Sequence, residues 1–439
     1  MPHPPKGTPM TTRSVSRRAA VALCLAASLL ATGHPADADP VRPTAVTGPP
    51  VLNAPVFNDP TADSGVPGTP SAAQSAVMDQ LIRLIQAVQP GGDIRFVMHQ
   101  FSAGQRSSEV ANALVAAHER GVRVKVILDS REDASNDAVE AQLTAALGTS
   151  ESAGSWVVGC EYPDPAAENR GCIARNYQHN KFALFSNVLV GGTVHPKVGF
   201  QTSSNLSDWY LYNSYNDAYT FTDATVYDGY LTYFNDLRAG RRTSVNPNYF
   251  WTTPTGTPIR AMFFPRRVTS GDPVVNILRL VECSYKTPDG VKHQTDIRMA
   301  LTAFNKNRKA IANELLRLRG ENCWIDIVFY ENAGNVMENV DSEIRKILGT
   351  TASNNKKMQV TPCRFTVGSR SVVPHTKLML LDGFYHDDIT PRVYTGSANF
   401  TYLENADDAW LRLSGRDLHD RYEAWFKSIR GACGGPPPS

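Results

Sequence analysis

Two short segments of the chain carry the same pair of residues at the same spacing. His179 is followed two positions later by Lys181, and His375 is followed in the same way by Lys377. Side chains two residues apart on a strand point to one face, so each segment presents an imidazole and an ammonium group together. One imidazole can attack phosphorus while the other protonates the leaving oxygen, with the ammonium groups neutralising the phosphoryl oxygens. The pattern therefore indicates phosphoryl transfer.

Each segment is followed, at a similar distance, by a second shared motif. Ser203 and Asn205 follow the first segment, and Ser397 and Asn399 follow the second. We expect the two asparagine amides to hydrogen-bond phosphoryl oxygens and the two serines to contribute to substrate binding. This set of groups meets at one place only if the two halves of the chain pack about a pseudo-twofold axis.

The elements that must position these residues also repeat along the chain. In the first half, the hydrophobic pattern predicts a helix over residues 73–88, a strand over 94–98, a helix over 107–119 and a strand over 122–128. Related sequences recur in the second half near residues 295–298, 312–315 and 322–325. We predict an α/β protein with two similar lobes from an internal duplication, each a mixed sheet flanked by helices, with the active site at the pseudo-twofold interface.

The duplicated motif resembles that of the phospholipase D superfamily, over most of residues 73–430. The second copy matches the family pattern fully, at His375, Lys377, Asp382, Gly396, Ser397 and Asn399. The first copy matches at His179, Lys181, Ser203 and Asn205, but Thr202 replaces the glycine and Ser186 replaces the aspartate. The resemblance implies a phosphohistidine intermediate, with His179 as the nucleophile and His375 as the general acid. Residue types and spacing alone do not order these two roles.

The departure at Ser186 bears on whether the first copy is active. The motif aspartate lies five residues after the lysine, so on a continuous strand it faces away from the imidazole. We therefore expect Asp382 to support the structure and activity to survive with Ser186. The alternative is a degenerate first half and a phosphate-binding protein without catalysis.

Other residues are secondary candidates. Asp217 and Asp408 are each followed by alanine at matching positions, and they are expected either to orient the imidazoles or to lie in solvated loops. Some of the aromatic residues after the first asparagine motif are expected in the core and the others in a cleft for lipid or nucleobase: Trp209, Tyr210, Tyr212, Tyr215 and Tyr219. A repeated pair at helical spacing is expected in the core: Tyr230 with Phe234, and Tyr422 with Phe426.

The N-terminal residues have the composition of an export signal. Basic residues precede an apolar run over 19–31, and Ala36-Asp37-Ala38 provides a small-residue cleavage site. We predict a signal peptide over 1–38, a lead-in rich in proline and threonine over 39–72, and lobes over 73–250 and 251–439. The Arg17-Arg18 pair is compatible with twin-arginine export, and the general secretory route stays open.

The cysteines fit an exported protein. Six remain after Cys24 of the signal peptide, and six cysteines allow 15 pairings. We favour a disulfide between Cys160 and Cys172, which flank a short polar loop. No cysteine or histidine spacing has the form of a zinc site, and the proposed chemistry needs neither metal nor cofactor.

Charge and export favour one substrate class. Without the signal peptide the chain is close to neutral, so it lacks the basic field of typical nucleic-acid binders. We expect a secreted, monomeric phosphodiesterase that cleaves the head-group phosphodiester of glycerophospholipids at a membrane or micelle surface, and that transfers the phosphatidyl group to an alcohol when an alcohol replaces water. The alternatives are a secreted metal-independent nuclease with the same site, which would bind nucleic acid, and the phosphate-binding relative.

Overall fold

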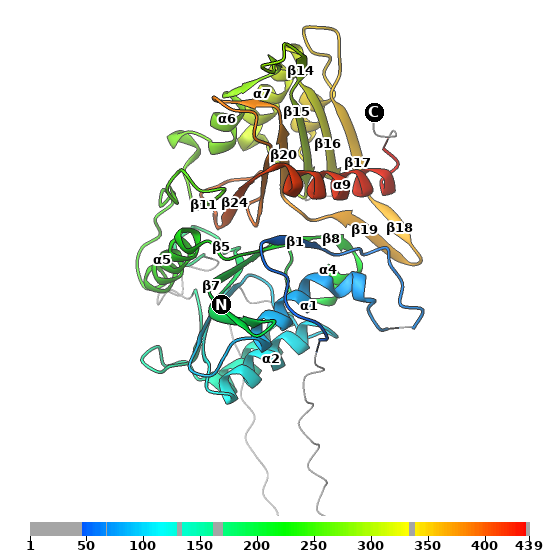
Figure 1. Ribbon diagram of the computed structural model, residues 1–439. Helices are drawn as coiled ribbons and strands as arrows, with labels where there is room; N and C mark the ends of the chain where they lie inside the picture. Colours follow the sequence, from blue (N-terminus) through cyan, green and yellow to red (C-terminus); the bar gives the residue numbers. More distant parts are fainter. Residues whose placement is uncertain (1–45, 67, 130–133, 161–169, 333–338, 436–439) are drawn as a thin grey trace, which may run out of the picture. The chain divides into compact units, whose positions relative to one another are not determined.

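The computed structural model describes residues 46–66, 68–129, 134–160, 170–332 and 339–435 (Figure 1). The predicted signal peptide over residues 1–38 lies outside these ranges. The described residues form two mixed sheets with helices on their faces, which confirms the predicted α/β class.

The first sheet has seven strands within the described residues. Their order is β1 (Ala54–Phe57), β9 (Asp217–Phe221), β7 (Thr193–Thr202), β6 (Lys181–Val190), β2 (Asp93–Met98), β3 (Arg123–Leu128) and β4 (Trp156–Gly159). The parallel strands β2, β3 and β4 are linked by the helices α2 (Ser107–Glu119) and α3 (Ala134–Leu147). Strands β6, β7 and β9 complete the sheet in antiparallel pairing.

The second sheet repeats this arrangement with eight strands. Their order is β10 (Trp251–Thr252), β11 (Ile259–Phe263), β24 (Ala409–Ser414), β22 (Arg392–Gly396), β20 (Leu378–Asp382), β15 (Asp296–Leu301), β16 (Trp324–Tyr330) and β17 (Gln359–Cys363). Its parallel strands β15, β16 and β17 are linked by α7 (Lys309–Gly320) and α8 (Ser342–Leu348). Apart from the edge strand β10, the strand order of the two sheets therefore matches, as expected of an internal duplication.

One strand of the first sheet comes from the segment that the sequence suggested was a lead-in. Strand β1 lies within residues 39–72 and pairs with β9, at the place that β11 occupies beside β24 in the second sheet. The helix α1 (Ala72–Gln86) follows β1 as α6 (Pro273–Leu278) follows β11. A capping box between Ser71 and Gln74 fixes the start of α1.

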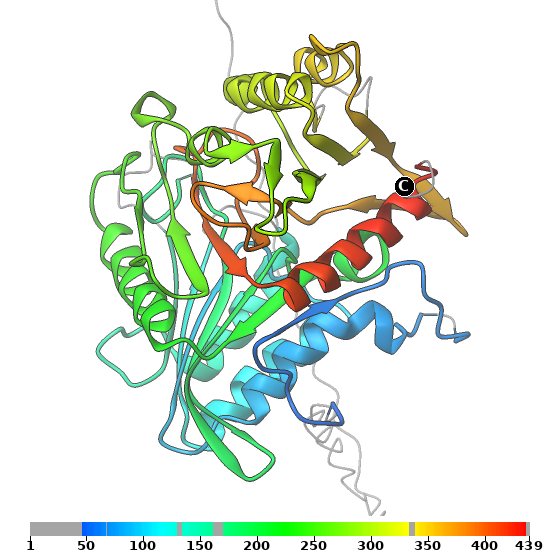
Figure 2. The ribbon, with the colours of Figure 1, turned by 45° about the horizontal axis from the view of Figure 1, so that its top comes forward.

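Two longer helices cover the inner faces of the sheets. The helices α5 (Ala224–Gly240) and α9 (Arg416–Ala432) contribute to a buried cluster that takes side chains from both lobes, including Phe182 and Leu380. Separate clusters lie under α1, α2 and α3 in the first lobe and under α6, α7 and α8 in the second. Both views place α9 beside β1, where Phe57 stacks on Trp425 at 4.5 Å (Figures 1 and 2).

The repeated aromatic pairs are part of this buried interior. Tyr230, Phe234, Tyr422 and Phe426 are all at most 1% exposed, so the prediction that they lie in the core is confirmed. Their common position on α5 and α9 shows that the duplication extends into the shared core.

Three disulfides join segments of the described chain. Cys160 pairs with Cys172, as predicted, and the sequence alone did not select the other two pairs, Cys283–Cys323 and Cys363–Cys433. Among the described residues, no helix is both long enough and apolar enough to cross a membrane.

Candidate active site

The two motif histidines lie where short strands pass between the lobes. In the first half, β5 (Tyr177–Gln178) pairs in parallel with β23 (Ala406–Asp407) of the second half, and the His179 amide donates to the Asp407 carbonyl at 2.9 Å. In the second half, β19 (Arg370–Pro374) pairs in parallel with β8 (Ser214–Tyr215) of the first half. Each histidine is thus held by a strand of the other lobe.

The two imidazoles have different partners. His179 Nδ1 lies 2.8 Å from Oδ1 of Asp408, so the Nδ1–H group donates to a carboxyl oxygen. His375 Nδ1 lies 2.9 Å from Oδ1 of Asn216 and donates to an amide oxygen. The Asn216 amide is held in this orientation because its Nδ2 donates to the Ser214 carbonyl at 3.2 Å. One histidine therefore has a charged partner and the other a neutral one.

The expectation that Asp217 and Asp408 occupy matching positions is wrong by one residue. The Ser203 amide donates to the Asp217 carbonyl, whereas the Ser397 amide donates to the Ala409 carbonyl. In the two halves, Asp217 is therefore the structural equivalent of Ala409, and Asn216 is the structural equivalent of Asp408. The alanine that follows each aspartate was a chance match, and only the strand pairing reveals the true register.

Asp217 has a different task, because its carboxylate joins the lobes. It is 1% exposed and accepts hydrogen bonds from the hydroxyls of Thr376 at 2.6 Å, Thr395 at 2.5 Å and Tyr422 at 3.2 Å. All three donors come from the second lobe. Asp217 thus holds the segment next to His375 without contacting the imidazole.

Both motif lysines are fully buried behind the histidines. Lys181 Nζ donates to the His179 carbonyl at 2.6 Å. Lys377 Nζ donates to the His375 carbonyl and to Thr302 Oγ1 at 3.0 Å, and it lies 3.3 Å from His375 Nε2. Lys377 thus lies beside the ring of its histidine, as the spacing predicts, but neither histidine is on a strand, because one follows β5 and the other follows β19.

Burial dominates the electrostatics of the site. It lowers the pKa of Lys377 well below its ordinary value, and the charge of Lys181 lowers it further. Burial, followed by the charges of Lys377 and Lys181, also lowers the pKa of His375 well below its ordinary value. Burial raises the pKa of Asp408 and lowers that of Lys181, although each charge favours the other. An anion bound among these groups would reverse the shifts of the cations.

The asparagines differ in their surroundings. Asn205 Nδ2 donates to Gln100 Oε1 at 3.2 Å. The side-chain oxygen of Asn399 is buried, and no hydrogen-bond partner for it occurs within the described part of the chain. Asn399 lines a cavity together with His179, whereas Asn205 is 2% exposed. Asn399 is thus the motif asparagine that lines the cavity.

The two motif serines bond within the protein. Ser203 Oγ donates to Asn216 Oδ1 at 3.2 Å, and the Ser397 hydroxyl accepts from the Ala409 amide at 3.1 Å and also bonds to Asp408. Both serines are fully buried. We infer that they position the partners of the imidazoles, a different role from the substrate contact expected from sequence.

The fifth position after each lysine points away from the imidazoles. Asp382 forms a two-pronged ion pair with Arg416 of α9, at 2.6 and 2.7 Å. Ser186 accepts a hydrogen bond from the Asp93 amide at 2.8 Å. Both side chains thus stabilise strand ends in their own lobe, so the serine replacement leaves the contacts of His179 unchanged.

The glycine of the second motif sits where the chain packs closely. Gly396 has φ +150°, and a Cβ atom there would lie 2.3 Å from the Ala409 carbonyl oxygen. Thr202, at the matching position in the first half, instead donates its hydroxyl to the Asp217 carbonyl at 2.7 Å. The substitution of threonine for glycine is therefore accommodated by a local change of backbone.

His99 is a site residue that the sequence reasoning missed. Its ring centroid lies 4.9 Å from that of His179, and its Nδ1 lies 3.1 Å from Asp129 Oδ2. Both His99 and Asp129 directly follow strands of the parallel unit, β2 and β3. Their position at the carboxyl ends of neighbouring parallel strands is the sequence signal that could have identified them. The matching residue in the second half is Thr302.

Aromatic residues of α4 (Asp208–Tyr212) cover the other imidazole. The ring of Tyr210 lies 4.9 Å from His375 and that of Trp209 lies 6.3 Å away. Trp209 is 42% exposed, whereas Tyr215 and Tyr219 are buried. Part of this aromatic group therefore lies in the core as expected, and the lining of a cleft by the others stays a prediction.

A cavity of about 520 Å³ opens in front of His179. Amides, carboxylates and tyrosines from loops of both lobes line it: Asn305, Asn339, Asn399, Asn405, Asp341, Asp408, Tyr177 and Tyr402. None of the lining residues within the described ranges is a lysine or an arginine. The positive charge of the site thus lies beneath the cavity, in the two buried lysines.

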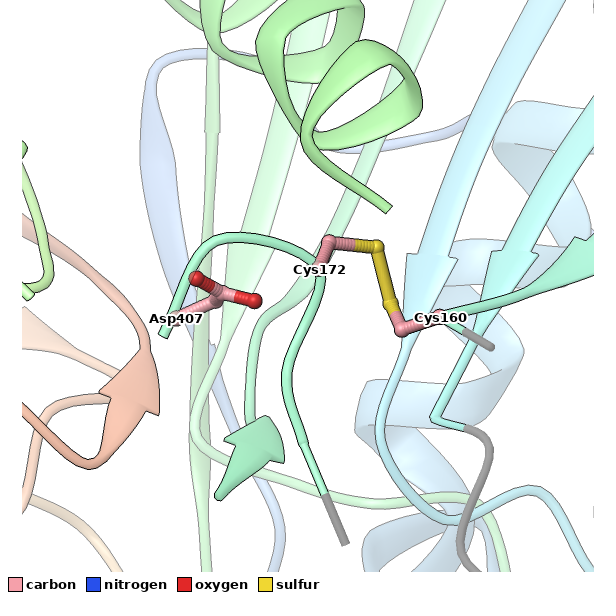
Figure 3. A group of neighbouring side chains, drawn as sticks. All are labelled: Cys160, Cys172 and Asp407. Carbon is pink, nitrogen blue, oxygen red and sulfur yellow. A yellow bond between two sulfur atoms is a disulfide. The ribbon is translucent and has the colours of Figure 1, made fainter. Parts of the chain in front are cut away.

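Cys160, Cys172 and Asp407 form a cluster near β5, with ligand atoms close enough together to suggest a metal site (Figure 3). The two sulfurs are bonded to each other, so neither is a thiolate. The Asp407 carboxylate accepts hydrogen bonds from the amides of Ile173 and Ala174. The cluster is therefore a covalent and hydrogen-bonded clamp on the loop that precedes His179.

Comparison with known proteins gives a family match for part of the chain. Residues 81–238 match the family described as cardiolipin synthase, PLD-like domain. The structure is similar to phosphatidylserine synthase from Haemophilus influenzae Rd KW20, with a TM-score of 0.53 and 12% identity over 81% of this chain and 84% of that one. No curated protein sequence matches the chain.

Two further solved structures align less closely. Polyphosphate kinase from Porphyromonas gingivalis gives a TM-score of 0.49 at 14% identity, over 79% of this chain and 47% of that one. Nuc from Salmonella typhimurium, a phospholipase D family member, gives 0.26 at 19% identity over 38% of this chain and 89% of that one. The family match shows a PLD-like domain of the phospholipase D superfamily over residues 81–238, and the likeness to phosphatidylserine synthase shows a shared fold. Members of this superfamily are phosphodiesterases and phosphotransferases.

Proposed function

We propose that the protein cleaves the head-group phosphodiester of a glycerophospholipid, producing phosphatidate and a free alcohol. The observation that carries this proposal is the pair of unlike imidazoles, His179 with Asp408 and His375 with Asn216, at one interface. A phosphodiester reaction through a covalent intermediate needs two histidines with different tasks.

His179 is the nucleophile in this proposal. Its Nδ1–H donates to Asp408, so Nε2 carries the lone pair that attacks phosphorus. The new N–P bond places positive charge on the imidazole, and the adjacent carboxylate stabilises that charge. Asn216 offers no such charge to His375.

His375 is the general acid. Burial and the nearby lysines lower its pKa, so its protonated form gives up a proton readily. The anionic substrate favours protonation as it binds. As the P–O bond to the head group breaks, His375 transfers its proton to the leaving oxygen, and the phosphatidyl group stays on His179.

The second half of the reaction reverses the proton transfer. His375, now neutral, removes a proton from water, and the water oxygen attacks phosphorus as the N–P bond breaks. Lys181, Lys377 and the amides of Asn205 and Asn399 stabilise the phosphoryl oxygens in both steps. An alcohol in place of water gives transphosphatidylation.

The cavity at His179 supports a zwitterionic phospholipid as the substrate. Tyr177 and Tyr402 offer aromatic faces and Asp341 offers a carboxylate to a cationic head group. The absence of lysine and arginine among its described lining residues makes it a poor groove for a polyanionic strand. Trp209 and Tyr402 are 42% and 41% exposed near the two imidazoles, a composition suited to the surface of a lipid layer.

We also propose that the protein acts outside the cytosol. Three disulfides in the described chain support an oxidising compartment. The predicted signal peptide leads to the same proposal. Protein recovered in the culture medium without residues 1–38 would support it, and retention of these residues on cell-associated protein would contradict it.

The test compares lipid and nucleic-acid substrates in the presence of chelator. Head-group release from vesicles of phosphatidylcholine and phosphatidylethanolamine is measured beside plasmid nicking, for the wild type and for His179→Ala and His375→Ala. The exposed His293 provides the control His293→Ala. We expect head-group release by the wild type and the control, and loss of it in both site variants.

The alternatives give different results. Salt-sensitive plasmid cleavage without head-group release would indicate the nuclease. Stabilisation by inorganic phosphate, with equal background rates in all variants, would indicate the phosphate-binding relative. Loss of activity in chelator would contradict a mechanism that needs no metal.

The roles of the histidines are tested with a substrate whose leaving group needs no proton. With a p-nitrophenyl phosphodiester, His375→Ala should still release one equivalent of p-nitrophenol per site and then stall as the phosphoenzyme. His179→Ala should release none. The opposite pattern would exchange the two roles.

A further inference from the structure

A second cavity, of about 230 Å³, lies in the second lobe on the face of the sheet that carries α6. Its walls come from β10, β11, β22 and β24, from α6, and from β21 (Phe384–Tyr385). On β24, Arg412 lines this cavity four residues after Asp408, which is about 13 Å along an extended strand. The cavity is therefore separate from the reaction centre.

The cavity contains a pair of like charges. Arg260 on β11 and Arg412 on β24 are direct cross-strand partners, and both line the cavity. Like charges at such positions destabilise a sheet. Burial and the charge of Arg412 both lower the pKa of Arg260. A sheet that keeps this pair gains stability when an anion lies between the two guanidinium groups.

No carboxylate in the described chain neutralises the pair. The titratable groups that act on Arg260 are Arg412 and two tyrosines, and none is a carboxylate. Two carboxylates of the same lobe form ion pairs with other arginines, Asp272 with Arg308 and Asp388 with Arg392. A third arginine, Arg266, also lines the cavity, and no carboxylate is among the described lining residues.

The hydrogen bonds of the pair leave donors unused. Arg260 donates to the Thr253 carbonyl and the Thr252 hydroxyl, and Arg412 Nη2 donates to the Thr257 carbonyl at 3.3 Å. The Nε of Arg412 is buried, and no acceptor for it occurs among the described residues. A buried donor without an acceptor costs free energy, which a bound oxyanion would recover.

The remaining walls combine further donors with apolar surface. Burial raises the pKa of Tyr394, so its hydroxyl stays protonated. Phe250 and Ile277 are among the apolar residues that close the sides. The volume is below the range of about 300–1,000 Å³ typical of sites that enclose a whole small ligand. It suits a head group and the first carbons of a chain that continues outside.

We propose that this cavity binds an amphiphile with an oxyanion head, a carboxylate or phosphate monoester carried on an apolar chain. The head lies between Arg260 and Arg412, and the chain lies along Phe250 and Ile277. The proposal does not depend on the catalytic function, because it rests on groups that take no part in the proposed reaction.

Calorimetric titration tests the proposal with three probes: dihexanoyl phosphatidate, decanoate and inorganic phosphate. The variant is Arg260→Gln with Arg412→Gln, and the control is Arg364→Gln, an exposed arginine of the same lobe. We expect the double variant to lose at least about tenfold in affinity for an amphiphilic anion, since a hydrogen bond to a charged group contributes about 1.5–3 kcal/mol. The control should bind as the wild type does.

Thermal unfolding separates loss of binding from loss of fold. Without ligand, the double variant should melt at or above the wild-type temperature, because the charge repulsion is gone. Phosphatidate or decanoate should raise the melting temperature of the wild type and control more than that of the double variant. Preference for one of these two probes identifies the head as a phosphate or a carboxylate.

Three results would overturn the proposal. The first is equal affinity of the wild type and the double variant for both amphiphiles. The second is inorganic phosphate binding as tightly as phosphatidate, which would show that the apolar walls contribute nothing. The third is an uncharged hexanoyl ester binding as tightly as the anions. Unchanged head-group release by the double variant would show that the cavity acts apart from the catalytic site.

Discussion

The carboxylate of Asp408 lies 2.8 Å from the ring of His179, although the two residues belong to different halves of the duplicated chain. At the matching position, His375 has the amide of Asn216. The pseudo-twofold axis thus relates two imidazoles that are equal in sequence motif and unequal in electrostatics. In the proposed mechanism this difference assigns the nucleophile and the acid.

Replacing Asp408 by asparagine should remove the difference. We expect Asp408→Asn to lower kcat on the order of 10²- to 10⁴-fold, because the developing charge on His179 loses its carboxylate partner. The fold should survive, since the amide can accept the same hydrogen bond. Head-group release at saturating substrate measures the effect, and the exposed Asp387→Asn is the control.

The reciprocal change, Asn216→Asp, replaces the neutral partner of His375 with a charged one. A carboxylate beside His375 should raise its pKa, so the general acid stays protonated to higher pH. The alkaline limb of the kcat profile should therefore move to higher pH. An unchanged profile with normal activity would argue against His375 as the acid.

Ser186 can be converted to the aspartate of the family motif. Ser186→Asp should change kcat by less than about threefold, because this position contacts the Asp93 amide and lies away from the imidazole. We expect a small loss of stability, about 1 kcal/mol, from the repulsion between the new carboxylate and Asp93. A gain in activity of tenfold or more would show that Ser186 marks a degenerate half.

His99 should act as a positioning residue. His99→Thr copies Thr302 of the second half and removes the pair with Asp129. Because the charge of His99 lowers the pKa of both His375 and Asp408, its loss should raise both. We expect about tenfold lower activity and an alkaline limb shifted to higher pH. A purely structural role would lower the melting temperature and leave the pH profile in place, and His293→Thr is the control.

Asp407 should make stability depend on pH. Burial raises its pKa to about 8, above the ordinary value near 4. Between these two pKa values the folded protein binds a proton that the unfolded chain has lost. The contribution of Asp407 to the free energy of unfolding is therefore fully present below about pH 4 and is lost as pH rises through about 8. Asp407→Asn keeps an acceptor for the Ile173 and Ala174 amides. It should make the free energy of unfolding depend less steeply on pH between these values. Urea unfolding at pH 5 and pH 8 measures it, and a steeper slope in the variant would contradict the prediction.

Much of the fold could be predicted from the sequence, because its signals are local. The apolar periodicity and the repeated strand-helix-strand units predicted both lobes, and the buried aromatic pairs on α5 and α9 followed the same reasoning. The exception was β1: its four residues are too few to show a pattern, and pairing with β9 alone makes them a strand.

The sequence by itself determined the chemistry of the site, and the tertiary structure decided its asymmetry. The spacing of two residues places each lysine beside its histidine on any strand, so His179 with Lys181 and His375 with Lys377 could be chosen without coordinates. The partners of the imidazoles come from the opposite lobe. A one-residue difference in strand register decides whether a carboxylate or an amide lies beside each imidazole. Such pairing depends on contacts between segments more than 150 residues apart, which no local pattern records.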